Sequence, residues 1–108
     1  MEVTVRNQGN DAIVEVSGRL DAVTASELEG GVADVLTGTE GRVVLNLRDL
    51  EYISSAGLRV ILVMVKRLKA KQKDLAVAAL QGAVKKVFEV SGFISFVKIY
   101  DTEEDALR

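Results

Sequence analysis

The stretch RVVLNLRDLEYISSAGLRVIL, residues 42–62, passes from one apolar run through a polar turn into another. Its first part, RVVLNL at 42–47, is apolar with β-branched residues, which predicts a central strand buried on both faces. Ser54 and Ser55 then precede a segment whose apolar residues recur at helical spacing, which predicts a helix over about 55–71. The stretch therefore predicts one strand–turn–helix unit of an α/β fold, with two adjacent hydroxyls where the helix begins.

The N-terminal part of the chain predicts a hairpin followed by a helix. EVTVR at 2–6 and AIVEVSG at 12–18 alternate polar and apolar residues, and the turn signal QGND lies between them. These features favour two antiparallel strands. The period then changes to 3.6, from a start at Asp21 or Thr24. The residues expected on the buried face of this helix are Leu28, Val32, Val35 and Leu36.

Strands and helices alternate along the rest of the chain. LAVAAL at 75–80 predicts a buried strand, and QGAVKKVFEVSG at 81–92 a short helix with Val84, Val87 and Phe88 inward. FVKIY at 96–100 predicts a strand, and a last short helix is expected from Asp101 or Thr102. The order ββαβαβαβα favours parallel strands with right-handed crossovers. We expect one α/β domain over 1–108, with a mixed sheet that starts as a hairpin, continues as βα units and carries helices packed on it.

The composition excludes several classes of protein. The chain has no Cys and no His, so it lacks disulfides, thiolate chemistry, and the commonest general base and metal ligand. It has no phosphate-binding glycine loop of the Gly-Lys-Ser/Thr type, so we expect no enzyme activity, cofactor or metal. The 14 basic and 16 acidic residues give a net charge of −2, which does not favour nucleic acid. With no membrane-spanning run of about 18–20 apolar residues and no signal peptide, we expect a cytoplasmic protein.

The two serines admit a structural and a functional interpretation. Serine is a favoured N-cap, but the Glu or Gln of a capping box is missing, because Gly57 and Leu58 stand three residues after Ser54 and Ser55. Only one hydroxyl can cap, so its neighbour is free for another role. The small residues Ala56 and Gly57 also leave the helix start open to a bulky partner. From these features alone, capping and a functional serine both remain open.

Other charged residues have simpler explanations. Asp21, Asp49 and Asp101 lie near predicted element boundaries, where capping and turn formation account for them. The lysines at positions 66, 69, 71 and 73 fit the solvated face and last turn of one helix. Neither set by itself predicts a catalytic or anion-binding site.

Three segments together resemble STAS domains, specifically the small stand-alone anti-sigma factor antagonists of bacteria. LNLRDLEYISSAGLRVIL resembles the family signature, GRLDAVTASELE a second family segment, and VKKVFEVSGFISFVKIYDTEEDAL a third. The resemblance extends from about Val3 to Leu107. The positions that match the signature around the phosphorylated residue are Asp49, Leu50, Ser54, Ser55, Ala56, Gly57 and Leu58.

The resemblance implies a phosphorylation switch with Ser55 as the acceptor and Ser54 as the alternative hydroxyl. Many family members carry Asp immediately before the phosphoserine, where this chain has Ser54. The implied partners are an anti-sigma factor with serine kinase activity, which the unphosphorylated chain binds to release a sigma factor, and a serine phosphatase of the PP2C type. A rival implication of the same resemblance is a STAS scaffold or adaptor subunit in a larger signalling or lipid-transport complex.

The helix after the serines also offers a candidate partner surface. On a helical wheel the main apolar stripe is formed by Leu58, Ile61, Leu62, Val65 and Leu68. A second group, formed by Val60, Val63 and Met64 near Arg67, lies on the opposite side. That group is either a partner-facing patch or part of a helix that is covered on both sides. The partner-binding residues predicted around Ser55 are Asp21, Asp49, Ser54, Ser55, Ala56, Gly57, Val60, Val63, Met64 and Arg67.

Overall fold

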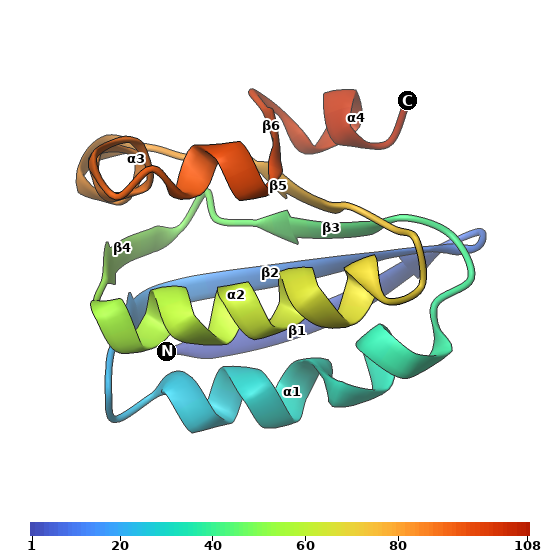
Figure 1. The fold of residues 1–108 in the computed structure, drawn as a ribbon, viewed down its shortest axis with the longest axis horizontal. Helices are drawn as coiled ribbons and strands as arrows, with labels where there is room; N and C mark the ends of the chain where they lie inside the picture. The colour runs from blue at the N-terminus through green and yellow to red at the C-terminus, as the bar shows by residue number, and fades with distance from the viewer.

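The structure, a computed structural model, describes residues 1–108 and contains six strands, four α-helices and one 3₁₀ turn (Figure 1). The strands are β1 (Glu2–Gln8), β2 (Asp11–Leu20), β3 (Val43–Asn46), β4 (Leu50–Ile53), β5 (Leu75–Ala78) and β6 (Lys98–Tyr100). The helices are α1 (Ala25–Gly38), α2 (Ser55–Lys69), α3 (Gly82–Val90) and α4 (Glu103–Ala106), and η1 (Phe93–Phe96) is the 3₁₀ turn.

The strands form one mixed sheet in the order β1-β2-β3-β5-β6, and β4 pairs with β2 off this path. The β1–β2 pair is antiparallel and every other pair is parallel. The predicted hairpin and the parallel alternation that follows it are therefore confirmed. β3 is central, as its apolar sequence predicts, because it lies between β2 and β5 and its residues Val43–Leu45 are buried.

The long strand β2 has two parallel neighbours along its length. Its first half pairs with β3, its last residues pair with β4, and the register shifts between Gly18 and Arg19. Gly18 has φ +86°, which glycine adopts without the steric cost that a side chain would bring. Its amide donates a 3.0 Å hydrogen bond to the carbonyl of Asp49, just before β4 begins. The change of neighbour along β2, from β3 to β4, is called the fork in β2. It directs β4, and the serines that follow it, away from β3.

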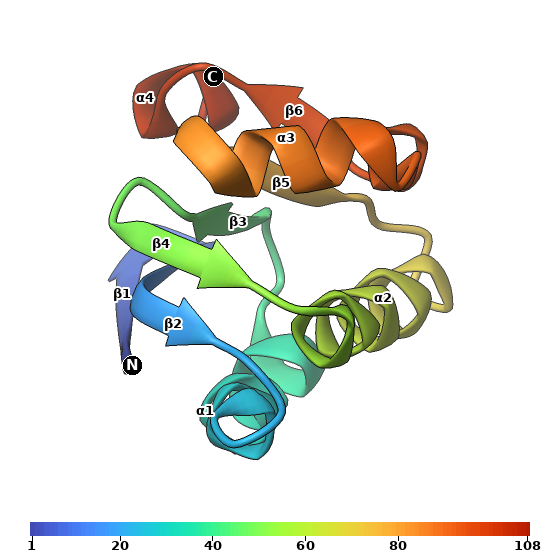
Figure 2. The same cartoon turned by 90° about the vertical axis from the view of Figure 1, so that its left-hand side faces the viewer.

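Helices cover both faces of the sheet (Figure 2). α1 and α2 lie side by side on one face, and their buried residues join the strands and α3 in one large core. α4 covers a smaller patch on the other face, where Ala106 packs with Ile13, Val44, Ala76 and Ala78. No helix combines the length and apolar character that crossing a bilayer requires.

The structure differs from the sequence-based prediction in several elements. β4 was not predicted, because only Leu50 and Ile53 of its four residues are buried and the strict alternation of a half-buried strand is absent. The segment predicted as a strand at 96–100 is divided, since Phe96 ends η1 and β6 begins at Lys98. Finally, α2 ends at Lys69 and β5 at Ala78, two residues earlier than predicted in each case.

Candidate functional site

Ser54 is the N-cap of α2. Its backbone is extended (φ −102°, ψ 176°), and its Oγ accepts a 3.4 Å hydrogen bond from the amide of Gly57. Its carbonyl accepts the first helical hydrogen bond, from Leu58, at 3.0 Å. The bond from Gly57 satisfies an amide that the first turn of a helix leaves without a partner within the helix. Of the two adjacent hydroxyls, that of Ser54 is therefore the one with a structural role.

Ser55 is the first residue of α2 and is exposed. No hydrogen bond within the chain engages its hydroxyl, and the first turn of the helix contains no acidic residue. Free amides and the positive end of the helix dipole make this position favourable for an added anion. The geometry thus leaves the Ser55 hydroxyl accessible to solvent, and phosphorylation of this residue stays a prediction.

The ends of β2 and β4 hold Asp21 beside the serines. Leu20 pairs with Ile53 in the parallel register, and the Ser54 amide donates a 2.9 Å hydrogen bond to the Leu20 carbonyl. The next residue on each strand is then Asp21 on one side and Ser54 on the other. We call this end of the sheet, where Asp21, Ser54 and Ser55 lie together, the serine edge; it is at the left of Figure 1.

Asp21 also organises the turn into α1. Its Oδ1 accepts hydrogen bonds from the amides of Val23 at 3.0 Å and Thr24 at 3.2 Å. These bonds, that of Thr24 first, lower the pKa of the Asp21 carboxyl below its ordinary value. Asp21 therefore forms the turn into α1 but does not cap the helix, whose N-cap is Thr24, and its carboxylate remains partly exposed beside the serines.

The structure does not bring Asp49 to the same place. Asp49 is exposed and precedes β4, whereas Ser54 follows the strand, so five residue steps of about 3.3 Å place their Cα atoms about 16 Å apart. Asp49 instead lines a shallow hollow with Gln81 and Gly82 at the start of α3. Asp49 and Ser55 therefore lie at opposite ends of β4, and the predicted part of Asp49 in the partner surface stays a prediction.

Three residues of the predicted partner surface are buried. Val60 and Met64 are core residues, so the interpretation of α2 as covered on both sides is the correct one for them. The cause is that α2 packs against α1 on one flank as well as against the sheet, which a helical wheel alone does not reveal. Gly57 is buried too, and its lack of a side chain serves its own chain, because a Cβ there would lie 2.7 Å from Leu20 Cγ. Of the outward group only Val63, 37% exposed, and Arg67 reach solvent.

Sequence analysis missed two exposed features of the serine edge. Val23, in the turn after Asp21, is 81% exposed, the largest exposure of any large apolar residue in the chain. Arg19 stacks on the ring of Tyr52, with its guanidinium carbon 4.2 Å from the ring centroid. An apolar residue inside a polar turn segment was the signal for Val23, whereas the Arg19–Tyr52 contact depends on the pairing of β2 with the unpredicted β4.

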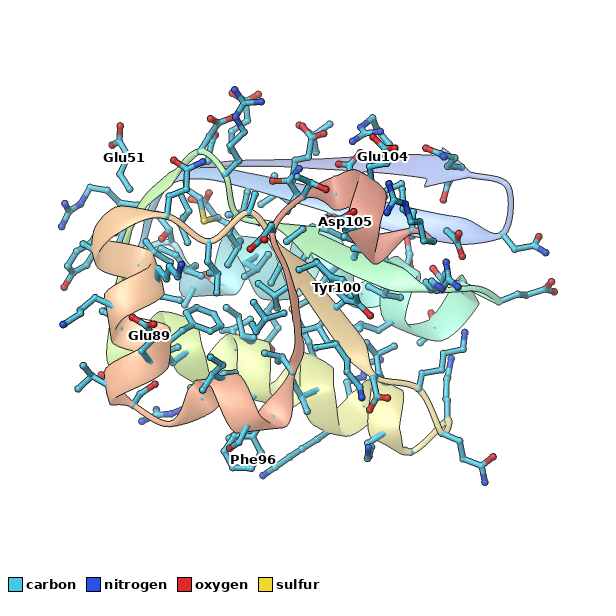
Figure 3. All side chains as sticks on the ribbon, turned by 90° about the horizontal axis from the view of Figure 1, so that it is seen from above. Glu51, Glu89, Phe96, Tyr100, Glu104 and Asp105 are labelled. Carbon is cyan, nitrogen blue, oxygen red and sulfur yellow. The ribbon has the colours of Figure 1, made fainter.

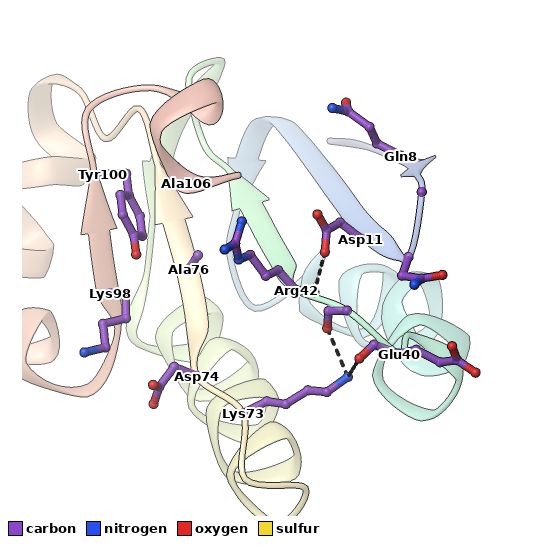
Figure 4. A pocket seen from close by; sticks show the side chains of 13 residues that line it. Gln8, Asp11, Glu40, Arg42, Lys73, Asp74, Ala76, Lys98, Tyr100 and Ala106 are labelled. Atoms are coloured by element: carbon purple, nitrogen blue, oxygen red, sulfur yellow. Dashed lines mark hydrogen bonds between the residues drawn. The ribbon is translucent and has the colours of Figure 1, made fainter. Parts of the chain in front are cut away.

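The largest hollow, about 770 Å³, lies at the opposite end of the sheet (Figure 4). Its charged side chains tie loops together. The Lys73 ammonium donates to the carbonyls of Glu40 and Gly41 at 2.8 and 3.0 Å, and the Arg42 guanidinium donates to the carbonyl of Leu107. Asp11 accepts from the Arg42 amide at 2.7 Å. These contacts give Asp11, Arg42 and Lys73 structural roles at the hollow.

Comparison with known proteins gives consistent matches over nearly the whole chain. The STAS domain family model matches residues 2–106. BtrV of Bordetella bronchiseptica, named as a candidate anti-sigma factor antagonist, is 38% identical over 106 residues, which cover 98% of this chain and 91% of BtrV. The anti-sigma F factor antagonist of Paenibacillus polymyxa is 28% identical over 108 residues, covering 99% and 92%. The crystal structure of an anti-sigma factor antagonist from Mycobacterium paratuberculosis superimposes with a TM-score of 0.89 at 26% identity, covering 98% and 90%.

Proposed function

The chain belongs to the STAS domain family, and from this we propose that it is an anti-sigma factor antagonist controlled by phosphorylation of Ser55. Two relatives that cover nearly the whole chain carry that functional name. The observation that carries the proposal is that the two neighbouring serines have different roles. Ser54 caps the helix, and Ser55 presents an unengaged hydroxyl to solvent.

Ser55 is the acceptor in this proposal, and Ser54 is not, for two physical reasons. A kinase must reach the hydroxyl, and Ser54 is only half-exposed with its Oγ directed at the Gly57 amide. A phosphate on Ser54 would also replace the capping oxygen. On Ser55 the phosphate projects from the first turn, where the helix N-terminus favours negative charge.

In the proposed switch, docking of the anti-sigma factor and a phosphate on Ser55 exclude each other at one surface of the chain. The unphosphorylated chain binds an anti-sigma factor that has serine kinase activity, and the sigma factor is released. The kinase then transfers the γ-phosphoryl group of ATP: the bond from phosphorus to Ser55 Oγ forms, the bond to the ADP oxygen breaks, and the hydroxyl proton is released. A PP2C-type phosphatase hydrolyses the phosphoester and restores the serine.

Phosphorylation prevents docking because of charge and hydration. The phosphate adds about −1.5 to −2 charges and three acceptor oxygens at the centre of the surface. A thousandfold loss of affinity corresponds to about 4 kcal/mol, which the desolvation of one unpaired phosphate can supply. The exposed or half-exposed residues assigned to this surface are Asp21, Ser54, Ser55, Ala56, Val63 and Arg67. Val60 and Met64 support it from the core, and Asp49 is left out of it.

The test is a titration against a purified anti-sigma factor kinase from the same organism. We expect Ser55→Asp to weaken binding by at least a hundredfold, Ser55→Ala to bind like the wild type, and the matched variant Ser54→Ala to keep most of the affinity. Incubation with kinase and ATP should add the mass of one phosphate to the wild type and to Ser54→Ala, but none to Ser55→Ala. Equal affinity of the wild type and Ser55→Asp would contradict the proposal and favour an adaptor role.

A further inference from the structure

A second surface runs along the C-terminal half of α2, away from the serines. A groove of about 530 Å³ lies there between the helix and residues 95–98 of η1 and β6. Its apolar lining consists of Leu62, Val65, Phe96 and Val97. Figure 3 shows the ring of Phe96 projecting from η1 at the surface of the molecule. The ring is 58% exposed, yet it is held in place by edge-to-face stacking on Phe93, with 5.9 Å between ring centroids.

The rim of this groove is strongly basic. Four lysines and one aspartate line it, so it carries a formal charge of +3 in a chain whose total is −2. Lys69 pairs with Asp74 at 3.0 Å, and Lys73 donates to backbone carbonyls of the loop between α1 and β3. Lys66 and Lys98 are exposed and form no ion pair within the chain. Beside the apolar floor, the ammonium groups of Lys66, Lys73 and Lys98 therefore have no ion-pair partner, and Lys98 is close enough to Asp74 to help lower the pKa of that carboxyl.

We propose that this groove binds a short acidic amphipathic helix of another protein. The wall formed by α2 from Leu62 to Lys69 is about 10 Å long, which matches two turns of a bound helix. Apolar side chains at i, i+3 or i+4, and i+7 of such a helix would pack on Leu62 and the Phe96 ring. Its carboxylates would lie beside Lys66 and Lys98, where opposite charge steers association and selects against basic partners.

An anionic lipid surface is a poorer match to the same residues. Lipid-binding polybasic segments gather about four to eight cations, each contributing about 1 kcal/mol, whereas the lining of this groove carries a net formal charge of only +3. The apolar residues also line a concavity between two elements, and they do not form the continuous apolar face that inserts into a bilayer. The shape and charge of the groove favour a peptide segment.

This surface is distinct from the proposed phosphorylation site. Leu62 lies seven residues after Ser55, or about 10 Å further along the axis of α2. No residue assigned to the serine surface lines the groove. Loss of binding in the groove would leave the switch at Ser55 unaffected, so the two proposals are tested separately.

The experiment uses two synthetic 14-residue peptides with the same leucines at i, i+3, i+4 and i+7 and either Glu or Lys at the polar positions. ¹⁵N spectra of the full chain locate binding, and fluorescence anisotropy of labelled peptide gives Kd. We expect the Glu peptide to shift the amide signals of Leu62, Val65 and Val97. The variant Lys66→Glu/Lys98→Glu should weaken its binding at least tenfold, equivalent to about 1.4 kcal/mol.

The matched control is Lys85→Glu/Lys86→Glu, which reverses two exposed lysines on α3 outside the groove and should change Kd by less than twofold. Phe96→Ser should weaken binding of the Glu peptide. The thermal midpoint of the variant should stay near that of the wild type, because the Phe96 ring is mostly exposed. Three results would each overturn the proposal: no groove shifts with the Glu peptide, equal affinity for the Lys peptide, or shifts only with phosphatidylglycerol vesicles.

Discussion

Gly57 packs directly against Leu20: a Cβ at Gly57 would lie 2.7 Å from Cγ and 3.0 Å from the carbonyl oxygen of Leu20. The same Cβ would lie 2.9 Å from Cγ1 of Ile53. The first turn of α2 thus lies on the paired ends of β2 and β4, where only glycine fits. This contact fixes the position of the serine edge relative to the sheet.

Gly57→Ala should therefore destabilise the protein, although alanine is the better helix former by about 1 kcal/mol. We expect a net loss of about 1–3 kcal/mol in the free energy of unfolding, measured by urea denaturation, since the crowded backbone must shift. Gly30→Ala is the matched control. Gly30 is also helical but has no atom within 4 Å of the added Cβ, so we expect a gain of about 0.5–1 kcal/mol. Stabilisation by both substitutions would refute the close packing at Gly57.

The capping role of Ser54 predicts unequal effects for the two serines. Ser54→Ala should lower the free energy of unfolding by about 0.5–1 kcal/mol, at the modest end for an N-cap because the bond to Gly57 is long at 3.4 Å. Ser55→Ala should change it by less than about 0.5 kcal/mol. Ser54→Asp should restore the stability lost in Ser54→Ala, since aspartate also caps. Thermal denaturation of the variants checks this order, and equal losses for both serines would show that Ser54 does not cap alone.

Burial predicts different roles for adjacent residues in the middle of α2. Met64→Ala should cost about 2–5 kcal/mol of stability because Met64 is fully buried. Val63→Ala, at a position that is 37% exposed, should cost less, about 1 kcal/mol or below. Denaturation curves compare the two, and a small effect at Met64 would return it to the partner surface. If the large effect is found, any loss of partner binding in a Met64 variant is explained by loss of folded protein and not by loss of a contact with the partner.

The depressed pKa of Asp21 predicts a contribution to acid sensitivity. Its carboxyl has an ordinary pKa of 3.8, and hydrogen bonds from Thr24 and Val23 lower that value in the folded protein. The unfolded chain therefore takes up this proton first, so the stabilisation is complete above pH 3.8 and is lost as the pH falls through the lower folded value. Asp21→Asn, which keeps the size of the side chain, should flatten the fall in stability below pH 4. Parallel curves for wild type and Asp21→Asn would contradict the assignment.

Much of the fold could be predicted because its signals are local. The hairpin and the buried residues of α1 follow from hydrophobic period, and β3 and β5 follow from uninterrupted apolar runs. Residue type at the strand–helix boundary made a serine cap of α2 one of two open interpretations. β4 could not be predicted, because its exposed residues Glu51 and Tyr52 interrupt the pattern, and its pairing depends on the register shift at Gly18.

The candidate site was only partly predictable, for a physical reason. The wheel of α2 shows which residues share a side, but not how many neighbours the helix has. Packing of α1 on its flank buries Val60 and Met64, and this contact joins residues far apart in sequence. Likewise, the separation of Asp49 from Ser55 appears only once the intervening residues are extended as β4.

The fork in β2 also determines how the serine edge can open. β4 is held to the sheet by its pairing with β2 alone, whereas β3 is paired on both sides. Fraying of β4 therefore breaks one short ladder and leaves the β1-β2-β3-β5 framework intact. In native-state hydrogen exchange, the amides of Tyr52 and Ile53 should exchange through this local opening. The amides of Val44 and Leu45 should exchange much more slowly, because they require global unfolding.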